Sequence, residues 1–171
     1  MKKIFLGLGS NLGDRGENLD EARIRIGDSI GRIIAASSVY QTEPWGFKSE
    51  NDFLNVVICA ETDLSPSGLL GRILMIESQM GRIRCEDQFS SRKIDIDILL
   101  FENEIVDEVA LKIPHPRMHE RKFVLVPLCE IGSGVVHPVL NQTIETLLKA
   151  CKDTSTVTRY PQSYNNLSQK L

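Results

Sequence analysis

The chain has 171 residues, of which 42% are apolar and 25% are charged, and its formal net charge is −3. These values fit one globular domain that buries roughly 70% of its unfolded surface and needs no disulfide or metal to hold its core. The negative charge argues against a nucleic-acid partner, and the lack of a signal-like leader or a membrane-length apolar run predicts a cytoplasmic protein with no membrane partner.

Residues 1–81 predict two helices among three strands. Apolar spacings of three and four mark a helix with its stripe over residues 19–30 and with Arg23 and Arg25 on its outer face. The second helix has the clearest punctuation, with Ser65 as N-cap and Gly81 as its stop. Strands are expected over residues 2–8, 33–41 and 53–61 from their apolar and β-branched content.

After residue 81 the pattern predicts short elements around one longer strand. We expect a polar loop over 82–91, strands over 92–101 and 154–160, a helix over 143–151 and a polar, poorly ordered tail over 161–171. Residues 116–131 fit a strand and also a helical turn ahead of Pro127, so both remain open. The domain is predicted to span residues 1–160.

Strands outnumber helices, and short turns join several of them, which predicts an α+β fold with a mainly antiparallel sheet and helices packed on its faces. Gly7, Gly9 and Gly13 give G-x-G-x-x-x-G, one residue longer than the dinucleotide fingerprint, and no P-loop motif occurs. No two cysteines form a C-x-x-C unit, so we expect reduced thiols at Cys59, Cys85, Cys129 and Cys151.

Asp95 and Asp97 lie two residues apart in an otherwise apolar predicted strand. Side chains two apart share a face, so the carboxylates would lie roughly 7 Å apart and could hold Mg²⁺ together with phosphate oxygens. Arg82, Arg84 and Arg92 precede the pair and could hold a polyphosphate. A solvated strand face also alternates polar and apolar residues, so the residues alone leave both a magnesium–nucleotide site and a wet surface open.

A series of fragments resembles the hydroxymethyl-dihydropterin pyrophosphokinases of folate synthesis over about the first 140 residues. The fragments are Gly9–Gly13, Tyr40–Pro44, Phe53–Asn55, Glu77, Arg82, Arg84, Arg92–Ile98, Ile113–Met118 and Arg121–Phe123. Each is weak alone, and their shared order and spacing carry the resemblance. It implies a ferredoxin-like three-layer fold and a Mg-dependent enzyme that transfers pyrophosphate from ATP to 6-hydroxymethyl-7,8-dihydropterin, releasing AMP. We expect the protein to be a monomer.

The resemblance also implies a role for each matching residue. Two magnesium ions would be held by Asp95 and Asp97, and Arg82 and Arg92 would engage phosphates during the reaction. The residues implied for ATP are Glu77, Arg84, Arg92, Ile98, His115 and Arg121. Those implied for the pterin are Thr42, Pro44, Trp45, Gly46, Phe53, Asn55, Asp95 and Phe123, with the ring stacked between the two phenylalanines.

The chain departs from the family pattern in three places. Residues 88–92 read Gln-Phe-Ser-Ser-Arg where many members have Arg-Trp-Gly-Pro-Arg, and Pro116 replaces an aromatic residue. Ala110 and Lys112 occupy a region that elsewhere supplies an arginine and a threonine. We expect these changes to affect loop dynamics and ATP affinity more than the chemistry, because Arg92 and both aspartates remain.

Two other classes of function compete with this one. A non-catalytic ferredoxin-like module would be a small-molecule sensor or an RNA binder, but residues 121–126 lack the glycine and the aromatic spacing of an RNA-binding strand. A phosphoryl or nucleotidyl transferase could use the same pair of aspartates. The released product separates the reactions: AMP for pyrophosphoryl transfer, ADP for phosphoryl transfer and inorganic pyrophosphate for nucleotidyl transfer.

Overall fold

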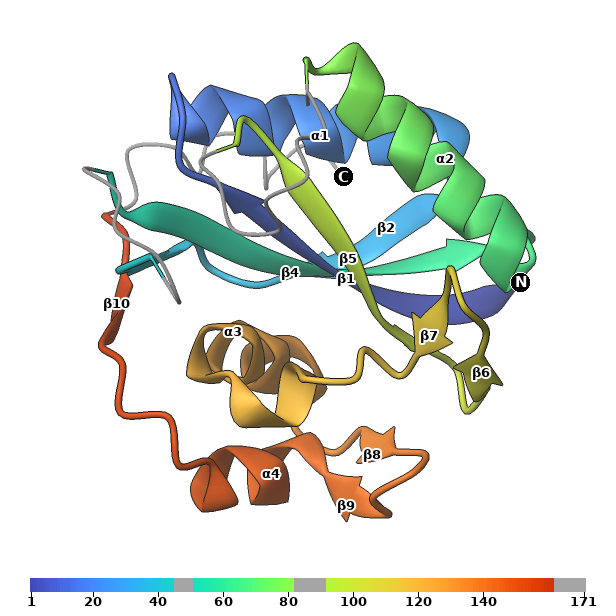
Figure 1. Cartoon of the computed structure of the whole chain (residues 1–171), viewed down its shortest axis with the longest axis vertical. Helices are drawn as coiled ribbons and strands as arrows, with labels where there is room; N and C mark the ends of the chain where they lie inside the picture. The colour runs from blue at the N-terminus through green and yellow to red at the C-terminus, as the bar shows by residue number, and fades with distance from the viewer. Residues whose placement is uncertain (45–50, 82–91, 162–171) are drawn as a thin grey trace.

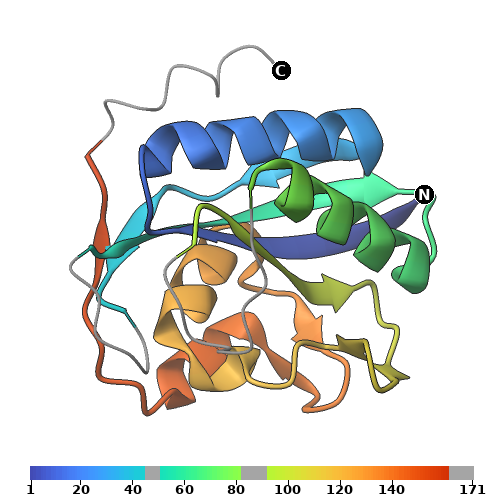
Figure 2. The same ribbon diagram turned by 45° about the horizontal axis from the view of Figure 1, so that its top comes forward.

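Figure 1 shows the computed structural model, which describes residues 1–44, 51–81 and 92–161. A six-stranded antiparallel sheet forms the middle layer, and helices cover both of its faces (Figures 1 and 2). The helices are α1 (Arg15–Ser29), α2 (Pro66–Gln79), α3 (Lys122–Gly132) and α4 (Ile144–Ala150). The predicted α+β class with a mainly antiparallel sheet is confirmed.

The sheet has the strand order β10-β3-β4-β1-β5, and β2 also pairs with β4. Its strands are β1 (Lys2–Ser10), β2 (Arg32–Ala36), β3 (Tyr40–Thr42), β4 (Phe53–Thr62), β5 (Asp95–Phe101) and β10 (Val157–Arg159). Two small hairpins lie outside it, β6 (Val106–Asp107) with β7 (Lys112–Ile113) and β8 (Val136–His137) with β9 (Gln142–Thr143). β1, flanked by β4 and β5, therefore lies in the interior of the sheet.

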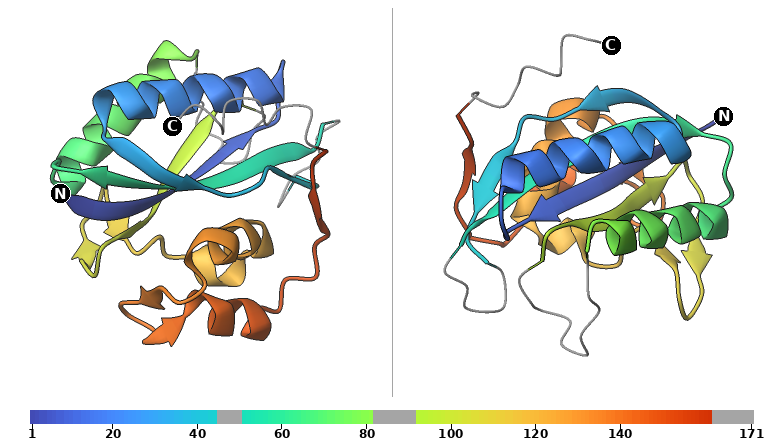
Figure 3. Two further views of the ribbon diagram at one scale, coloured as in Figure 1. Left: turned by 180° about the vertical axis from the view of Figure 1, so that it is seen from behind. Right: turned by 90° about the horizontal axis from the view of Figure 1, so that it is seen from above.

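The two faces of the sheet build two separate cores. Ile4 and Leu6 of β1 pack with α1 and α2, whereas Phe5 between them packs with α3 and α4 on the other face. In Figure 3 α1 and α2 lie side by side over one face, while α3 and α4 lie together below the other. A strand covered on both faces must be apolar at nearly every position, which explains the unbroken apolar run at the N-terminus.

Side-chain caps fix where the first two helices begin. Asp14 accepts a hydrogen bond from the Glu17 amide at the start of α1, and Ser65 accepts one from the Gly68 amide at the start of α2. The predicted N-cap of the second helix is confirmed. Gly81, predicted as its stop, follows the last turn with φ of 85°, which is the left-handed conformation that favours glycine.

The outer face predicted for α1 is wrong at Arg23. Its side chain is only 18% exposed and lies 3.5 Å from Asp20, and its buried Nε makes no hydrogen bond. Burial lowers the pKa of Arg23 and raises the pKa of Asp20. Long aliphatic stems let arginine cover apolar surface, so helical spacing alone did not reveal this packing.

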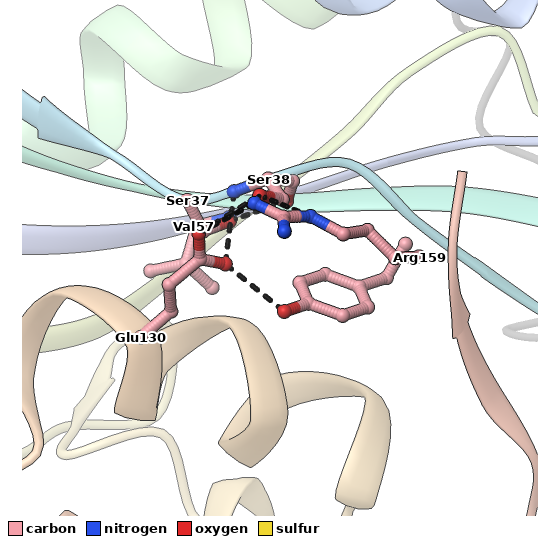
Figure 4. A network of polar contacts seen from close by, with 6 residues as sticks. Ser37, Ser38, Val57, Glu130 and Arg159 are labelled. Atoms are coloured by element: carbon pink, nitrogen blue, oxygen red, sulfur yellow. Dashed lines mark hydrogen bonds and ion pairs between the residues drawn. The ribbon is translucent and has the colours of Figure 1, made fainter. Parts of the chain in front are cut away.

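The single strand predicted over residues 33–41 is wrong, because the chain forms two strands there, β2 and β3. Ala36 pairs with Ile58 and Tyr40 pairs with Asn55, so the chain advances from 36 to 40 while β4 advances only from 58 to 55. The chain between β2 and β3 therefore has one residue more than the facing part of β4, which makes a bulge. Beside this bulge, the Ser37 hydroxyl accepts a hydrogen bond from the Val57 amide at 3.0 Å (Figure 4).

The segment left open between strand and helix contains a 3₁₀ turn (Met118–Glu120) followed by α3. Pro127 lies inside α3, where it has no N–H to donate to the carbonyl four residues earlier. The α3 side chains Val124, Leu125 and Leu128 are buried in the core below the sheet. Tertiary packing of this apolar face outweighs the proline.

Three cysteines in the described parts of the chain, Cys59, Cys129 and Cys151, are free, and Cys85 lies outside the described residues. Across residues 1–44, 51–81 and 92–161, no helix is long and apolar enough to cross a membrane. The predicted 1–160 domain boundary stays a prediction, as does the poorly ordered tail, since all but residue 161 of that tail lies outside the described residues.

Candidate active site

A pocket lies between the lower face of the sheet and the first turn of α3. Its walls come from four strands and a helix that are distant in the sequence. It is lined by Gly7, Leu8, Gly9, Thr42, Glu43, Phe53, Asn55, Val56, Val57, Arg92, Asp95, Asp97, Leu99, Arg121, Phe123 and Val124. Eight of the predicted site residues are therefore brought together: Thr42, Phe53, Asn55, Arg92, Asp95, Asp97, Arg121 and Phe123.

Asp95 and Asp97 are half-buried on the pocket face of β5. In the register of the sheet they stand opposite Gly9 and Gly7 of β1. Glycine has no side chain, so β1 places no side chain directly across from either carboxylate. The sequence holds part of this signal, because glycine is unusual inside an apolar strand, but no local pattern places Gly7 and Gly9 opposite the two aspartates.

Arg92 is fixed beside the acidic pair at both backbone and side chain. Its Nη1 donates to Asp95 Oδ2 at 2.9 Å. Asn11 is fully buried just after β1, and its side-chain Oδ1 accepts a hydrogen bond from the Arg92 backbone amide at 2.7 Å. The backbone amide of Asn11 donates to the Arg92 carbonyl at 3.2 Å. Asn11 belongs to the glycine-rich fragment that carries the resemblance, but no local pattern predicts this contact, because residues 11 and 92 are far apart in the chain.

The α3 side of the pocket presents a cation and an aromatic ring. The Arg121 guanidinium carbon lies 5.8 Å from the centre of the Phe123 ring, within cation–π range. Burial lowers the pKa of Arg121, while the charges of Asp97 and Asp95 raise it. Arginine stays protonated at pH 7, so the α3 wall of the pocket is positively charged and faces the two carboxylates.

The β3–β4 side of the pocket carries an oriented amide beside an aromatic ring. Asn55 is buried, and its Nδ2 donates to Thr42 Oγ1 at 2.8 Å. The amide oxygen therefore remains as an acceptor near Gly9, where an added Cβ would lie 3.1 Å from it. Phe53 starts β4 just after Asp52, whose backbone carbonyl accepts from Arg15 at 2.7 Å.

His115 lies close to the acidic pair without lining the pocket. Its amide donates to the Leu99 carbonyl at 3.0 Å, and its Nδ1 accepts from the Arg117 amide at 3.2 Å. Burial, followed by the positive charge of Arg121, lowers the pKa of His115 to about 4, although Asp95 acts in the opposite direction. The imidazole is therefore neutral at pH 7.

Other predicted site residues lie away from this pocket. Glu77 of α2 is 2% exposed and accepts the Ile96 amide at 2.9 Å, and Ile98 belongs to the core between the sheet and α1 and α2. Pro44 follows Glu43 without lining the pocket. Trp45, Gly46, Arg82 and Arg84 lie outside the described residues, so their predicted roles stay predictions.

The acidic pair suits Mg²⁺ by its chemistry and its exposure to the pocket. In the parts of the chain that the structure describes, no three His, Cys, Asp or Glu side chains come together as a metal site of their own. Mg²⁺ is commonly held by one or two carboxylates, with water and substrate phosphates completing an octahedron. Asp95 and Asp97 fit that pattern, since both carboxylates line the pocket from one face of β5.

The fold and this pocket define an α+β protein that can hold a flat ring and an anion side by side. Residues 5–133 match the family described as 7,8-dihydro-6-hydroxymethylpterin-pyrophosphokinase (HPPK). The chain therefore belongs to the HPPK family and is an enzyme of the pyrophosphokinase class.

Individual relatives agree with this assignment over most of the chain. The chain is similar to a 2-amino-4-hydroxy-6-hydroxymethyldihydropteridine pyrophosphokinase of Methylorubrum extorquens, at 42% identity over 80% of this chain and 86% of the relative. The enzyme of the same name from Aquifex aeolicus is 38% identical over 85% of this chain and 89% of the relative.

The solved structures show the same fold. The crystal structure of a Plasmodium falciparum HPPK-DHPS triple mutant superposes with a TM-score of 0.72 at 18% identity, covering 87% of this chain and 44% of that chain. The predicted ferredoxin-like fold is thereby confirmed.

Proposed function

We propose that this enzyme transfers the pyrophosphoryl group of ATP to the hydroxymethyl oxygen of 6-hydroxymethyl-7,8-dihydropterin with Mg²⁺, giving the pterin diphosphate and AMP in folate biosynthesis. Membership of the HPPK family and the names of the relatives support the substrate class. The observation that carries the proposal is the pocket itself, in which Asp95 and Asp97 share one chamber with Phe53 and Phe123.

The pterin end of the pocket is assigned to the aromatic and amide groups. A flat heterocycle can stack between Phe53 on the sheet and Phe123 on α3. The Asn55 amide oxygen would accept a hydrogen bond from a ring N–H or amino group, while its nitrogen donates one hydrogen bond to Thr42.

The phosphate end is assigned to the charged groups. Asp95 and Asp97 would hold two Mg²⁺ ions, which when bound neutralise triphosphate charge and make the substrate hydroxyl easier to deprotonate. Asp95 would exchange its Arg92 partner for a cation, and the released Arg92 guanidinium could then engage phosphate oxygens. Arg121 lies on the opposite wall, where it can orient the same anion.

The remaining predicted roles are part of the proposal through the family resemblance. Glu77, Arg84, Ile98 and His115 are assigned to the nucleotide, Arg82 to the phosphates, and Pro44, Trp45 and Gly46 to the pterin. Glu77 and Ile98 lie on the opposite side of the sheet from the acidic pair, so the adenosine would have to bind around the end of β5.

Phosphorus NMR of the purified enzyme with ATP, Mg²⁺ and the hydroxymethyl pterin tests the reaction, with a control that omits the pterin. We expect pterin-dependent AMP and a pterin diphosphate. Appearance of ADP would assign a phosphoryl transferase to the same pocket, and release of inorganic pyrophosphate would assign a nucleotidyl transferase. Either product would overturn the proposal.

A further inference from the structure

The helix that carries Arg121 and Phe123 has no side-chain cap of its own. Arg121 is the N-cap residue of α3 and makes no side-chain cap hydrogen bond. Lys122, the first residue of the helix, lies between the two pocket residues. Its amide is one of the donors that a helix start leaves without an intrahelical partner. The position of both pocket residues therefore depends on what holds this amide.

Asp153, far along the chain, supplies the missing cap. Its Oδ2 accepts the Lys122 amide at 2.8 Å, and its Oδ1 accepts the Ser155 amide at 2.9 Å. Burial raises the pKa of Asp153, but the hydrogen bonds from the Ser155 and Lys122 amides outweigh it and leave the pKa below its usual value. An ionised carboxylate at a helix N-terminus also interacts favourably with the helix dipole.

The strand that follows Asp153 holds the other end of the same helix. β10 pairs with β3, and Arg159 of β10 donates to Ser38 Oγ at 2.8 Å. Ser38 in turn donates to Glu130 in the last turns of α3 at 2.8 Å (Figure 4). The Tyr40 hydroxyl of β3 also donates to Glu130, at 3.0 Å.

We propose that residues 153–159 are a positioning element for the pocket, in which Asp153 fixes the first turn of α3 and hence Phe123 opposite Phe53. These residues lie beyond the part of the chain that matches the family, which ends at residue 133. The role of Phe123 in this inference rests on the proposed function. Asp153 is not among the residues that line the pocket, and it acts through the Lys122 backbone.

The test compares three variants of the full chain. Asp153→Ala removes the cap, Asp153→Asn keeps an oxygen acceptor for the Lys122 amide, and Lys152→Ala alters the exposed neighbour as a matched control. Loss of a helix cap shifts the equilibrium between the ordered and the frayed first turn roughly fivefold. The apparent affinity can change by at most that factor, so KM for the pterin should rise about three- to fivefold in Asp153→Ala. It should stay within about twofold of wild type in the other two variants.

Amide exchange of Lys122, measured by NMR without substrates, separates this inference from the proposed function. Exchange at Lys122 should accelerate about fivefold or more in Asp153→Ala and should keep its wild-type rate in Lys152→Ala. An unchanged Lys122 exchange rate would overturn the positioning role. A wild-type enzyme that makes no pterin diphosphate would refute the proposed function and leave the exchange measurement to decide the role of Asp153.

A second variant keeps the test informative if Asp153→Ala does not fold. Arg159 is largely exposed, with 61% of its side chain accessible, so Arg159→Ala should fold. It loosens the far end of α3, and we expect a rise of about twofold in the pterin KM. Pterin KM values equal to wild type in every folded variant of Asp153 and Arg159 would contradict the proposal.

Discussion

At the scale of single residues, Asp97 offers the simplest test of the acidic pair. Its side chain lies in a pocket wall and not in a core, so its removal should leave the fold intact. We expect Asp97→Ala to lower kcat at least about a thousandfold. The variant lacks one of the two carboxylates proposed to hold Mg²⁺, so the charge on the phosphates would be less well neutralised. Steady-state turnover measures this, with thermal unfolding as the check on folding.

Asp28→Ala is the matched control for Asp97→Ala. Asp28 is an exposed acid of α1 that does not line the pocket. Its turnover should equal that of wild type. An Asp97→Ala enzyme with comparable activity would rule out the assignment of the acidic pair to the metal.

Arg92 should act mainly in the transition state. In the absence of substrates its guanidinium is paired with Asp95 through Nη1, and we expect that pair to open as phosphate binds. We expect Arg92→Ala to lower kcat about a hundredfold or more with a smaller change in ATP affinity. Kinetics and direct ATP binding measure the two effects. A loss of ATP affinity with an unchanged kcat would contradict this role.

His115 should make the stability of the fold depend on pH. Its folded pKa of about 4 lies below the unfolded value near 6.5, so only the unfolded state takes up a proton between these values. The contribution is fully present above pH 6.5 and is lost as pH falls toward 4. Each pKa unit is worth about 1.4 kcal/mol, so the loss from this group is about 3 kcal/mol over the window.

Urea unfolding at pH 7 and pH 4.5 measures the effect of His115. Between pH 7 and pH 4.5, the free energy of unfolding should fall less in His115→Gln than in wild type. His137, whose pKa is also lowered by burial and by His119, is present in both proteins and so cancels in the comparison. Equal losses in the two proteins would mean that His115 titrates normally in the folded state.

At the scale of elements, the junction between α1 and β2 depends on a glycine. A Cβ at Gly31 would lie 2.0 Å from the backbone carbonyl oxygen of Glu61, a distance that requires the backbone to move. Gly31→Ala should therefore lower the free energy of unfolding by at least about 2 kcal/mol. Chemical denaturation of the purified variant measures the change.

Gly27 provides the control for Gly31 within the same region. It is exposed inside α1, and an added Cβ would meet nothing within 4 Å. Gly27→Ala should raise the free energy of unfolding by about 0.5–1 kcal/mol, because alanine favours the helix. If both variants were equally stable, the close approach of Gly31 to β4 would not constrain the junction.

The elements that the sequence predicted well are those with strong local signals. Ser65 and Gly81 mark the two ends of α2. Both ends were predictable because capping and stop positions depend on backbone groups that are near in the sequence. The bulge between β2 and β3 depends on how two halves of β4 pair with them, which no local pattern encodes. Arg23 was misplaced because helical periodicity cannot tell a solvated arginine from one packed along its stem.

At the scale of the whole molecule, the site exists only because β5 and β4 lie on either side of β1. Sequence spacing indicated that Asp95 and Asp97 share a face, and the fold confirms it. Sequence could not show that Gly7 and Gly9 lie opposite them, or that Asn11 holds Arg92, since these contacts cross the sheet. The family resemblance, and not the spacing of residues, predicted the eight residues that meet in one pocket.

The same sheet order also separates residues that the resemblance groups together. Glu77 and Ile98 lie on the α1–α2 side, whereas the acidic pair lies on the α3 side. The nucleotide must therefore reach both faces around the end of β5 if all the predicted contacts form. The monomeric state remains a prediction, which analytical ultracentrifugation would check.

The most direct test is a crystal structure of the enzyme with Mg²⁺, a non-hydrolysable ATP analogue and the hydroxymethyl pterin. The account predicts the pterin ring between Phe53 and Phe123, with metal density against Asp95 and Asp97 and the hydroxymethyl oxygen directed at the analogue. A pterin ring bound elsewhere, or metal held away from both aspartates, would contradict it.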